Sequence, residues 1–480
     1  MEEAKHFINH RWVPAAAAGE PIPVIDPSDG RVFTTLARGT AQDVDAAVRA
    51  ARACYDGAWG ALPAAERGRT LMRVALLLAA RQDELACLEA RDTGKPLKQA
   101  HADAAAVSRY FEFYAGAADK LHGDTIPYQC GYTVITLREP HGVTGHIIPW
   151  NYPLQIFGRS VGAALAAGNA CVVKPAEDAC ISLLRVAELL AEAGLPEGAL
   201  NIVTGYGHEA GAALARHLGI DYVSFTGSPR TGTLVAQMAA EHHAPVTLEL
   251  GGKSPQIVFA DADLEAAMPV LLAAIVQNAG QTCSAGSRLL VERPLYETLL
   301  AELGERFTQL RVGPSTLDLD CGPLISAKQL QRVQTFLDEA QRDGIATCAS
   351  ASIVEDVPPG GFYQAPVLLR DVPPAHRLAR EEVFGPVLAA MPFDDEPAAL
   401  ALANGTRYGL AAGIWTRDGA RQLRLARHVH AGQVFINNYG AGGGVELPFG
   451  GMGQSGHGRE KGFEALYGFT TLKTISIRHG

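Results

Sequence analysis

Strand-like runs and helical stretches alternate between residues 143 and 250, and this alternation is the feature that most constrains the fold. The expected strands are residues 143–148, 170–174, 200–204, 222–225 and 246–250. Most of the intervals between them show the apolar spacing of helices. A chain that repeats strand and helix in this way builds a parallel sheet with helices on its faces. The sequence therefore predicts a doubly wound α/β unit that binds ligands at the carboxyl ends of its strands.

The chain is too long for this unit alone. It has 480 residues, and a single hydrophobic core stops growing at about 250–300 residues, so we expect two or three packed units. A strand at 286–292 and a helix from near Pro294 restart the alternation and predict a second α/β domain. A hydrophobic content of 48% with 19% charged residues is ordinary for a folded globular protein and excludes a disordered chain.

The outer parts of the sequence predict covering helices and a small separate sheet. Residues 40–121 carry helical patterns, and Gly94 with Pro96 ends one of these helices. Residues 6–35 read as short strands around turns. Two extended segments, 125–139 and 471–478, lie far apart in the sequence, and we expect them to pair with each other in a sheet of their own.

Charge and hydropathy exclude several classes of function. The formal net charge is -10 and no clustered basic face is visible, which argues against binding of nucleic acid. The longest apolar candidate, residues 266–276, is interrupted by Pro269 and is shorter than the ~18 residues of a membrane span. The N-terminal residues lack the basic and apolar regions of a signal peptide. We therefore expect a cytoplasmic protein that contacts no membrane.

One cysteine stands apart from the other seven. The eight cysteines occur without paired or regular spacing, so neither a disulfide framework nor a metal site is expected. Most of them are expected to be inert core thiols. Around Cys283, however, Gly280, Ser284, Ala285 and Gly286 leave little side-chain bulk, which suits a nucleophile that another molecule approaches.

A carboxylate accompanies this thiol in the segment 248–287. Glu249 stands before the glycine pair Gly251 and Gly252, and Cys283 follows 34 residues after Glu249 (283 - 249). A thiolate is a strong nucleophile towards a carbonyl carbon, and a carboxylate can activate the water that later releases an acyl group. The two residues together predict covalent chemistry at a carbonyl carbon.

These two motifs resemble the signatures of the aldehyde dehydrogenase superfamily. The signatures are a Glu-Leu-Gly-Gly-Lys run, here 249–253, and a Gly-Gln-x-Cys run 34 residues after the Glu, here 280–283. The resemblance covers nearly the whole chain. It implies NAD-dependent oxidation of an aldehyde to the carboxylic acid, with Cys283 as the nucleophile and Glu249 as the base.

The resemblance also implies three domains. A Rossmann-like NAD-binding domain is expected from residues 1–121 and 142–251, and an α/β catalytic domain from residues 252–450. A small β oligomerisation arm is expected from residues 122–141 and 466–480. In the family such an arm joins subunits, so a homodimer or homotetramer is expected.

Asn151 is the third expected catalytic residue. Prolines on both sides restrict the backbone, and Pro153 pushes Tyr152 towards extended geometry, so that Asn151 can be held in a fixed direction. A turn Asn between core aromatic residues is the alternative interpretation. The resemblance assigns Asn151 to an oxyanion hole together with the backbone N–H of Cys283.

Several residues at the ends of the predicted strands match the coenzyme contacts of the family. In the family, the residues matching Lys174 and Glu177 bind the adenosine ribose, and a carboxylate there repels a 2′-phosphate, which favours NAD over NADP. Both are otherwise ordinary surface charges. The run 225–232 follows a strand and opens a helix, where N–H groups can meet a pyrophosphate. The expected cofactor-binding residues are Ile148, Pro149, Trp150, Lys174, Glu177, Gly207, Phe225, Thr226, Gly227, Ser228, Gly232, Leu250, Gly251, Glu382 and Phe384.

Arg159 gives the main indication of the substrate. It lies eight residues after Asn151 and matches the Arg with which succinate semialdehyde dehydrogenases hold the substrate carboxylate. Those enzymes carry a second Arg six residues before the cysteine, where this chain has Gln277, so a surface or salt-bridged Arg is the alternative. The expected substrate residues are Tyr152, Arg159, Gln277 and Thr282, and the expected substrate is an aldehyde, with a carboxylated semialdehyde as one candidate. A glycine-rich loop at 440–446 is of the kind that closes a substrate tunnel.

Three other functions remain as alternatives. In a CoA-acylating dehydrogenase, CoA would replace water, but release by a thiol needs no base such as Glu249. A cysteine hydrolase would use Cys283 without redox chemistry. A non-catalytic binding protein on the same fold is disfavoured because Cys283, Glu249 and Asn151 are all present.

Overall fold

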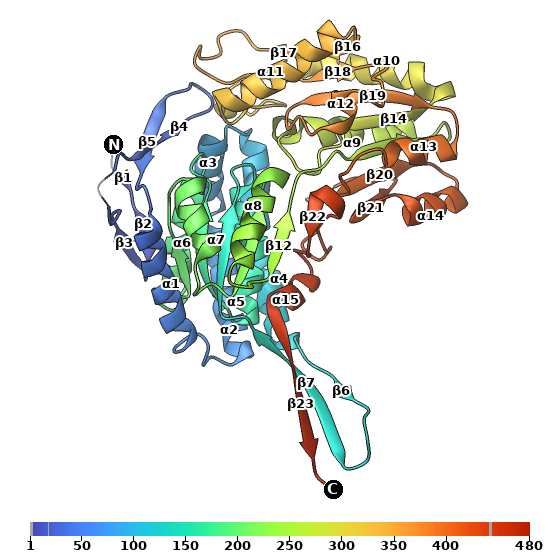
Figure 1. Cartoon of the computed structure of the whole chain (residues 1–480). Coiled ribbons are helices and arrows are strands. Elements are labelled where there is room, and N and C mark those ends of the chain that lie inside the picture. Colours follow the sequence, from blue (N-terminus) through green and yellow to red (C-terminus); the bar gives the residue numbers. More distant parts are fainter. Residues whose placement is uncertain (1–2, 18, 441–443) are drawn as a thin grey trace.

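The computed structural model describes residues 3–17, 19–440 and 444–480 (Figure 1). The chain forms two α/β units, each built around its own sheet, and a narrow arm that carries the C-terminus away from both (Figure 1). Residues 441–443 of the predicted tunnel loop lie outside the described residues.

The first sheet contains the five strands predicted from the alternating pattern. These strands run parallel in the spatial order β12-β11-β8-β9-β10, so that the chain order reverses between β8 and β11. Such a reversal opens a crevice at the carboxyl ends of the strands. The eight strands are β22 (Gly456–His457), β12 (Val246–Glu249), β11 (Tyr222–Thr226), β8 (Val143–Ile148), β9 (Ala170–Pro175), β10 (Leu200–Ile202), β2 (His6–Ile8) and β3 (Arg11–Val13).

Helices cover both faces of this sheet, which confirms the predicted doubly wound unit. A large apolar core lies between one face and helices α2 to α6, and a smaller core lies between the other face and helices α1, α7 and α8. The helical elements are α1 (Ala41–Tyr55), α2 (Ala64–Ala80), α3 (Gln82–Thr93), α4 (Leu97–Ala117), η1 (Ala118–Lys120), α5 (Pro153–Ala167), α6 (Ile181–Glu192), η2 (Gly207–Gly211), α7 (Ala212–Arg216) and α8 (Pro229–Ala240).

The second unit has a seven-stranded sheet with its own core. All neighbouring strands in it are parallel except the edge pair β16 and β18. The strands, in spatial order, are β16 (Thr347–Ser350), β18 (Val367–Leu369), β19 (Val387–Phe393), β14 (Arg288–Glu292), β13 (Pro255–Val258), β20 (Ala411–Trp415) and β21 (Gln433–Ile436). The helical elements are α9 (Leu264–Val276), η3 (Gln277–Gly280), α10 (Arg293–Gln309), η4 (Ser315–Leu317), α11 (Ala327–Arg342), α12 (Arg377–Arg380), α13 (Glu396–Ala403) and α14 (Gly419–His428).

The arm is the small sheet expected from the two extended segments. Strand β23 (Thr470–Arg478) pairs antiparallel with β7 (Tyr132–Pro140) along its whole length, and β6 (Thr125–Ile126) pairs with the other side of β7. The prediction that these distant segments pair is therefore confirmed. The other short strands are β1 (Glu3–Ala4), β4 (Ile22–Ile25), β5 (Val32–Leu36), β15 (Arg311–Val312) and β17 (Ser352–Ile353).

After the second unit, the chain returns to the first one before it enters the arm. Strand β22 pairs antiparallel with β12, and η5 (Gly453–Ser455) precedes it. Helix α15 (Glu464–Gly468) follows, and its Leu466 packs in the same core as α5. This returning segment covers the edge of the first sheet (Figure 1). The predicted domain boundaries stay a prediction.

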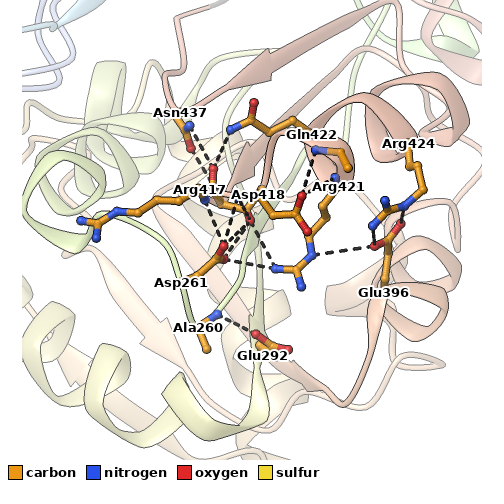
Figure 2. Close-up of polar contacts among 12 residues, drawn as sticks. Ala260, Asp261, Glu292, Glu396, Arg417, Asp418, Arg421, Gln422, Arg424 and Asn437 are labelled. Carbon is orange, nitrogen blue, oxygen red and sulfur yellow. Dashed lines mark hydrogen bonds and ion pairs between the residues drawn. The ribbon is translucent and has the colours of Figure 1, made fainter.

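A polar network joins the ends of β13 and β20 to helix α14 (Figure 2). The Asp261 carboxylate accepts hydrogen bonds from the Thr416 hydroxyl, at 2.8 and 2.9 Å, and from the Arg421 guanidinium, at 3.2 Å. Asp418 caps the N-terminus of α14 and accepts from the backbone N–H groups of Ala420 and Arg421. These contacts tie the strand that follows the Glu249 motif to its neighbour.

Helix α9 carries Pro269 in its interior, so the apolar run that contains it is helical. The helix has 13 residues and contains the apolar run 266–276, so it is shorter than the ~18 residues of a membrane span. No helix in the described part of the chain is long and apolar enough to cross a bilayer.

Asn169 connects the first sheet to the segment that leads into the arm, and its replacement tests this connection. Its side chain accepts from the Gly142 N–H, at 3.0 Å, and donates to the carbonyls of Ala164, at 3.1 Å, and Phe469, at 2.9 Å. We expect Asn169→Ala to lower the free energy of unfolding by roughly 2–4 kcal/mol, because buried partners lose their hydrogen bonds. Thermal melting compared with the exposed control Asn438→Ala checks this, and equal shifts would contradict it.

Candidate active site

A cavity of about 270 Å³ lies where the first unit meets the second. Cys283 lines this cavity together with five other residues that were predicted to be catalytic or to contact the substrate. They are Asn151, Tyr152, Arg159, Gln277 and Thr282. The structure therefore brings together residues that lie up to 132 positions apart in the chain (283 - 151).

Cys283 sits in the loop after η3, which ends at Gly280, and is partly exposed to this cavity. The loop packs against the glycine pair of the Glu249 motif. A Cβ atom at Gly252 would lie 2.5 Å from the Cys283 carbonyl oxygen, so no larger residue fits without a shift. The two signature runs thus lie in contact, although Cys283 follows Gly252 by 31 residues in the chain (283 - 252).

The Asn151 side chain points to the cysteine loop. It follows β8, just before helix α5 begins at Pro153, and is 5% exposed. Its Nδ2 donates to the Gln281 carbonyl at 3.0 Å, and the Asn278 side chain donates in return to the Asn151 carbonyl at 2.9 Å. The Asn151 amide is therefore held in place, and it donates to the facing loop at a residue two positions before Cys283.

Glu249 ends strand β12 and is buried, but it is not among the residues that line the cavity. Neither of its carboxylate oxygens has a hydrogen-bond partner within the described structure. The carboxylate lies against Gly450, where a Cβ atom would come within 2.8 Å of Oε1. Burial raises the pKa of Glu249 well above its usual range, the charge of Glu460 raises it further, and Arg159 and Arg459 lower it.

The same kind of burial acts on the thiol. Burial raises the pKa of Cys283 above its usual value, the positive charge of Arg159 lowers it, and the carboxylates of Glu382 and Glu249 raise it. Burial therefore disfavours the charged form of both groups.

Arg159 projects from α5 into the cavity wall, where its guanidinium already has a partner. It forms an ion pair with Glu460, and the residues are 7% and 1% exposed. The guanidinium also lies 4.8 Å from the centre of the Phe449 ring. The other Glu460 oxygen accepts from the Ser224 hydroxyl at 2.8 Å. The contacts of Arg159 are therefore those of the salt-bridged alternative. Its partner Glu460 was not identified from the sequence.

The predicted coenzyme residues of the first unit lie along the carboxyl edge of its sheet. Ile148 ends β8, Thr226 ends β11 and Gly207 begins the turn after β10. Lys174, in β9, forms a 2.7 Å ion pair with Glu177, whose side chain is 29% exposed. Helix α8 begins at Pro229, shortly after β11 ends at Thr226, so its first turn, with free backbone N–H groups, follows the carboxyl end of that strand.

Two predicted coenzyme residues come from the second unit. Glu382 Oε1 accepts from the Gly252 N–H at 2.9 Å, which holds this carboxylate beside the glycine pair. The Phe384 ring meets the Trp150 ring edge-on, with 5.4 Å between the ring centres. An aromatic pair, a carboxylate and a helix N-terminus along one crevice fit a dinucleotide, which offers a flat ring, ribose hydroxyls and a pyrophosphate.

Most of the remaining cavity wall was not identified from the sequence. Helix α9 contributes one face, and the spacing of its residues is a signal that could have found them once this helix was placed beside the cysteine loop. Tyr439 and Phe449 gave no local signal. Gly440 belongs to the loop that was expected to close a substrate tunnel. The other cavity residues that were not predicted as site residues are Gln155, Ile156, Pro269, Val270, Ala273, Ala274, Ser284, Tyr439 and Phe449.

Comparison with known proteins identifies the family. The sequence profile described as "Aldehyde dehydrogenase family" matches residues 12–475. The chain belongs to the aldehyde dehydrogenase family. The resemblance noted in the sequence is thereby confirmed, together with the oxidation of an aldehyde to the acid as the reaction class.

Individual aldehyde dehydrogenases match over nearly the full chain. The hydroxyisobutyraldehyde dehydrogenase of Mycolicibacterium austroafricanum is 43% identical over 98% of this chain and 93% of its own. A crystal structure of a Burkholderia cenocepacia protein named for the same family is 75% identical, with a TM-score of 0.99 over 99% of this chain and 100% of its own. The NAD⁺ complex of an aldehyde dehydrogenase from Bacillus cereus is 40% identical, with a TM-score of 0.96 over 100% and 97%. The predicted fold is confirmed.

The raised pKa of Cys283 can be tested by alkylating the thiol in the coenzyme-free aldehyde dehydrogenase. Below that pKa, the reactive thiolate fraction grows about tenfold for each pH unit. We therefore expect alkylation of Cys283 by iodoacetamide to keep rising from about pH 7 to about pH 9 without levelling off. Mass spectrometry of the peptide that carries Cys283 separates it from the exposed Cys87 and Cys130. A plateau below about pH 8 would contradict the expected desolvation.

Proposed function

We propose that this aldehyde dehydrogenase forms a covalent adduct between Cys283 and the aldehyde, transfers hydride to NAD and hydrolyses the resulting thioester with water activated by Glu249. The observation that carries the proposal is that Cys283 and Asn151 face one cavity, while a buried carboxylate without a hydrogen-bond partner, that of Glu249, lies against Gly450, the residue after Phe449 of the cavity wall. Each of the three residues then performs one part of the reaction.

In the first step, the Cys283 sulfur attacks the aldehyde carbon and the carbonyl oxygen becomes an oxyanion. The Asn151 amide and the Cys283 backbone N–H are the proposed donors to this oxygen. Asn151 is held by its neighbours before the substrate arrives, so it does not reorganise during the reaction. The thiol must lose its proton first, and the nearby positive charge of Arg159 favours that loss.

NAD, when bound, supplies the acceptor for the hydride that leaves the aldehyde carbon, and a thioester remains on the sulfur. Lys174 and Glu177 are proposed to hold the adenosine ribose, and the first turn of α8 the pyrophosphate. Glu382 and Phe384 are proposed to hold the nicotinamide ribose and ring. The partly exposed Glu177 carboxylate supports NAD over NADP, since it accepts from a free 2′-hydroxyl and repels a 2′-phosphate.

In the last step, Glu249 takes a proton from the water that attacks the thioester carbon, and the sulfur leaves as thiolate. A carboxylate whose pKa is raised by burial is a stronger base than one in water. Both Glu249 oxygens are available for a water molecule, since neither is used by the described part of the protein. This supports release by water and disfavours the CoA-acylating alternative.

The residues that line the cavity indicate which class of aldehyde fits it. Most of the described residues that line it are apolar or aromatic, and Arg159 alone among them carries a charge. An aliphatic or aromatic aldehyde fits such a wall. The predicted grip of Arg159 on a substrate carboxylate stays a prediction, because its place in the wall supports it while its ion pair with Glu460 leaves less charge for a second anion.

We also propose that the arm joins two copies of the chain and that the protein is cytoplasmic. Strand β23 is the open edge of the arm, and its Leu472 and Ile477 are 50% and 47% exposed. A long edge strand with exposed apolar residues is stabilised by a partner. All eight cysteines are free, which is typical of a reducing compartment.

Glu249→Gln tests the division of roles. We expect a burst of NADH of about one equivalent per site followed by turnover slowed ~10² to 10⁴-fold, because acylation needs no base at Glu249 while thioester hydrolysis does. Stopped-flow absorbance at the NADH band measures both phases. The exposed Glu241→Gln serves as the matched control. An unchanged steady rate would mean that water is activated elsewhere, and NADH production by Cys283→Ala above a trace would remove the nucleophile assignment.

Arg159 is tested with its partner neutralised as well. Arg159→Leu alone leaves the buried Glu460 unpaired, so the double variant with Glu460→Gln is the informative one. If Arg159 holds a carboxylate, the Michaelis constant for ω-carboxylated aldehydes is expected to rise about tenfold or more relative to that for neutral aldehydes of the same length. Steady-state kinetics over both series measures this, and equal changes would reject the carboxylate role.

A further inference from the structure

Lys95 is a fully buried lysine that the proposed mechanism does not use. It lies in the turn between α3 and α4, in the run 92–96 whose glycine and proline end a helix. Its side chain has no exposed surface, and the neighbouring Glu89 and Asp103 side chains are 0% and 3% exposed. Burial of an ammonium group is costly unless each of its protons is donated.

All three protons of the Lys95 ammonium have an acceptor. Two go to carboxylates, Asp103 Oδ2 and Glu89 Oε1, the latter at 3.3 Å. The third goes to the backbone carbonyl of Asn151 at 2.9 Å. The ammonium also lies 4.4 Å from the centre of the Tyr152 ring, in a cation–π contact.

The Asn151 carbonyl is thereby held from two sides. Lys95 donates from the core of the first unit, and Asn278 Nδ2 donates from the cysteine loop at 2.9 Å. A carbonyl oxygen has two lone pairs, so both are used. The peptide between Asn151 and Tyr152 is fixed, and with it the direction in which the Asn151 side chain leaves the backbone.

Two of the residues that Lys95 contacts, Asn151 and Tyr152, reach the cysteine loop. The Asn151 amide donates to the Gln281 carbonyl at 3.0 Å, and the Tyr152 hydroxyl lies 2.8 Å from the Thr282 hydroxyl. Gln281 and Thr282 are the two residues before Cys283. Lys95 therefore sits behind the two side chains that meet the loop of the nucleophile.

Stability alone does not account for this cluster. A buried ion pair is often no more stabilising than apolar residues of the same volume. An apolar side chain at position 95, however, donates no hydrogen bond to the Asn151 carbonyl. The contact that needs a lysine is the one to the amide residue of the proposed oxyanion hole.

We propose that Lys95 is a positioning residue for oxyanion stabilisation, which holds the Asn151 amide through the backbone carbonyl of Asn151. Glu89 and Asp103 keep the ammonium in place, with Ser182 donating to Glu89 at 2.8 Å and Gln155 donating to Asp103 at 2.6 Å. This inference rests on the proposed role of Asn151.

A double-mutant cycle between Lys95 and Asn151 tests the proposal. The measured quantity is the rate constant of the NADH burst, which reports acylation. We expect Asn151→Ala to lower it ~10² to 10³-fold and Lys95→Met to lower it ~10 to 10²-fold. The double variant is expected to match Asn151→Ala within about threefold, because Lys95 then has no amide left to position. Coenzyme affinity, measured by fluorescence titration, is expected to stay within about twofold in each variant.

The controls separate positioning from a loss of folding. Lys98→Met removes an exposed lysine three residues away that also donates to a carbonyl, that of Asp318, and is expected to leave the burst unchanged. Lys95→Met leaves two buried carboxylates without a cation, so the cycle is repeated with Glu89→Gln and Asp103→Asn added, which removes every charge of the cluster.

Three results would overturn the proposal. If the rate losses of the two single variants multiply in the double variant, Lys95 acts independently of Asn151. A burst unchanged by Lys95→Met would show that the contact positions nothing. An unchanged burst in Asn151→Ala alone would remove the oxyanion role of Asn151 itself, and this inference with it, while the outcome for Glu249→Gln would stand.

Discussion

The hydrogen bonds exchanged between Asn151 and the cysteine loop are the contact on which the active site depends. The Asn151 amide donates to Gln281, and Asn278 donates to the Asn151 carbonyl. Asn151 belongs to the first unit, whose core is separate from the core of the unit that carries the loop. Since each unit is held together by its own apolar packing, this polar contact sets where the thiol lies relative to the carboxyl edge of the first sheet.

Burial changes the pKa of the reactive groups near this contact. Glu249 is buried and Cys283 is only partly exposed to the cavity, and burial raises the pKa of both groups. In such surroundings nearby charges act strongly, which is why Arg159 influences both groups while it is paired with Glu460. The nucleophile in the cavity and the buried base behind its wall are therefore both groups whose charged form is disfavoured by burial.

Much of the architecture followed from local patterns. The five strands of the first sheet, the helices of residues 40–121 and the pairing of the two arm segments were predicted, because apolar periodicity reports which face of a strand or helix is buried. The catalytic motifs were also visible, since glycine permits and proline restricts particular backbone conformations wherever they occur. Tyr439, Phe449 and Lys95 were not assigned to the site, because nothing near them in the chain indicates what they meet in space.

The sequence by itself determined the family, the doubly wound first unit and the candidate nucleophile, base and amide, since these depend on residue type and on spacing along the chain. Only the tertiary structure decided which groups are dry and which are paired. Glu460 lies 301 residues after Arg159 (460 - 159) and still neutralises it, and Lys95 lies 56 residues before Asn151 (151 - 95) and still holds its carbonyl. Desolvation and charge pairing act over ångströms in space, so no pattern along the chain contains them.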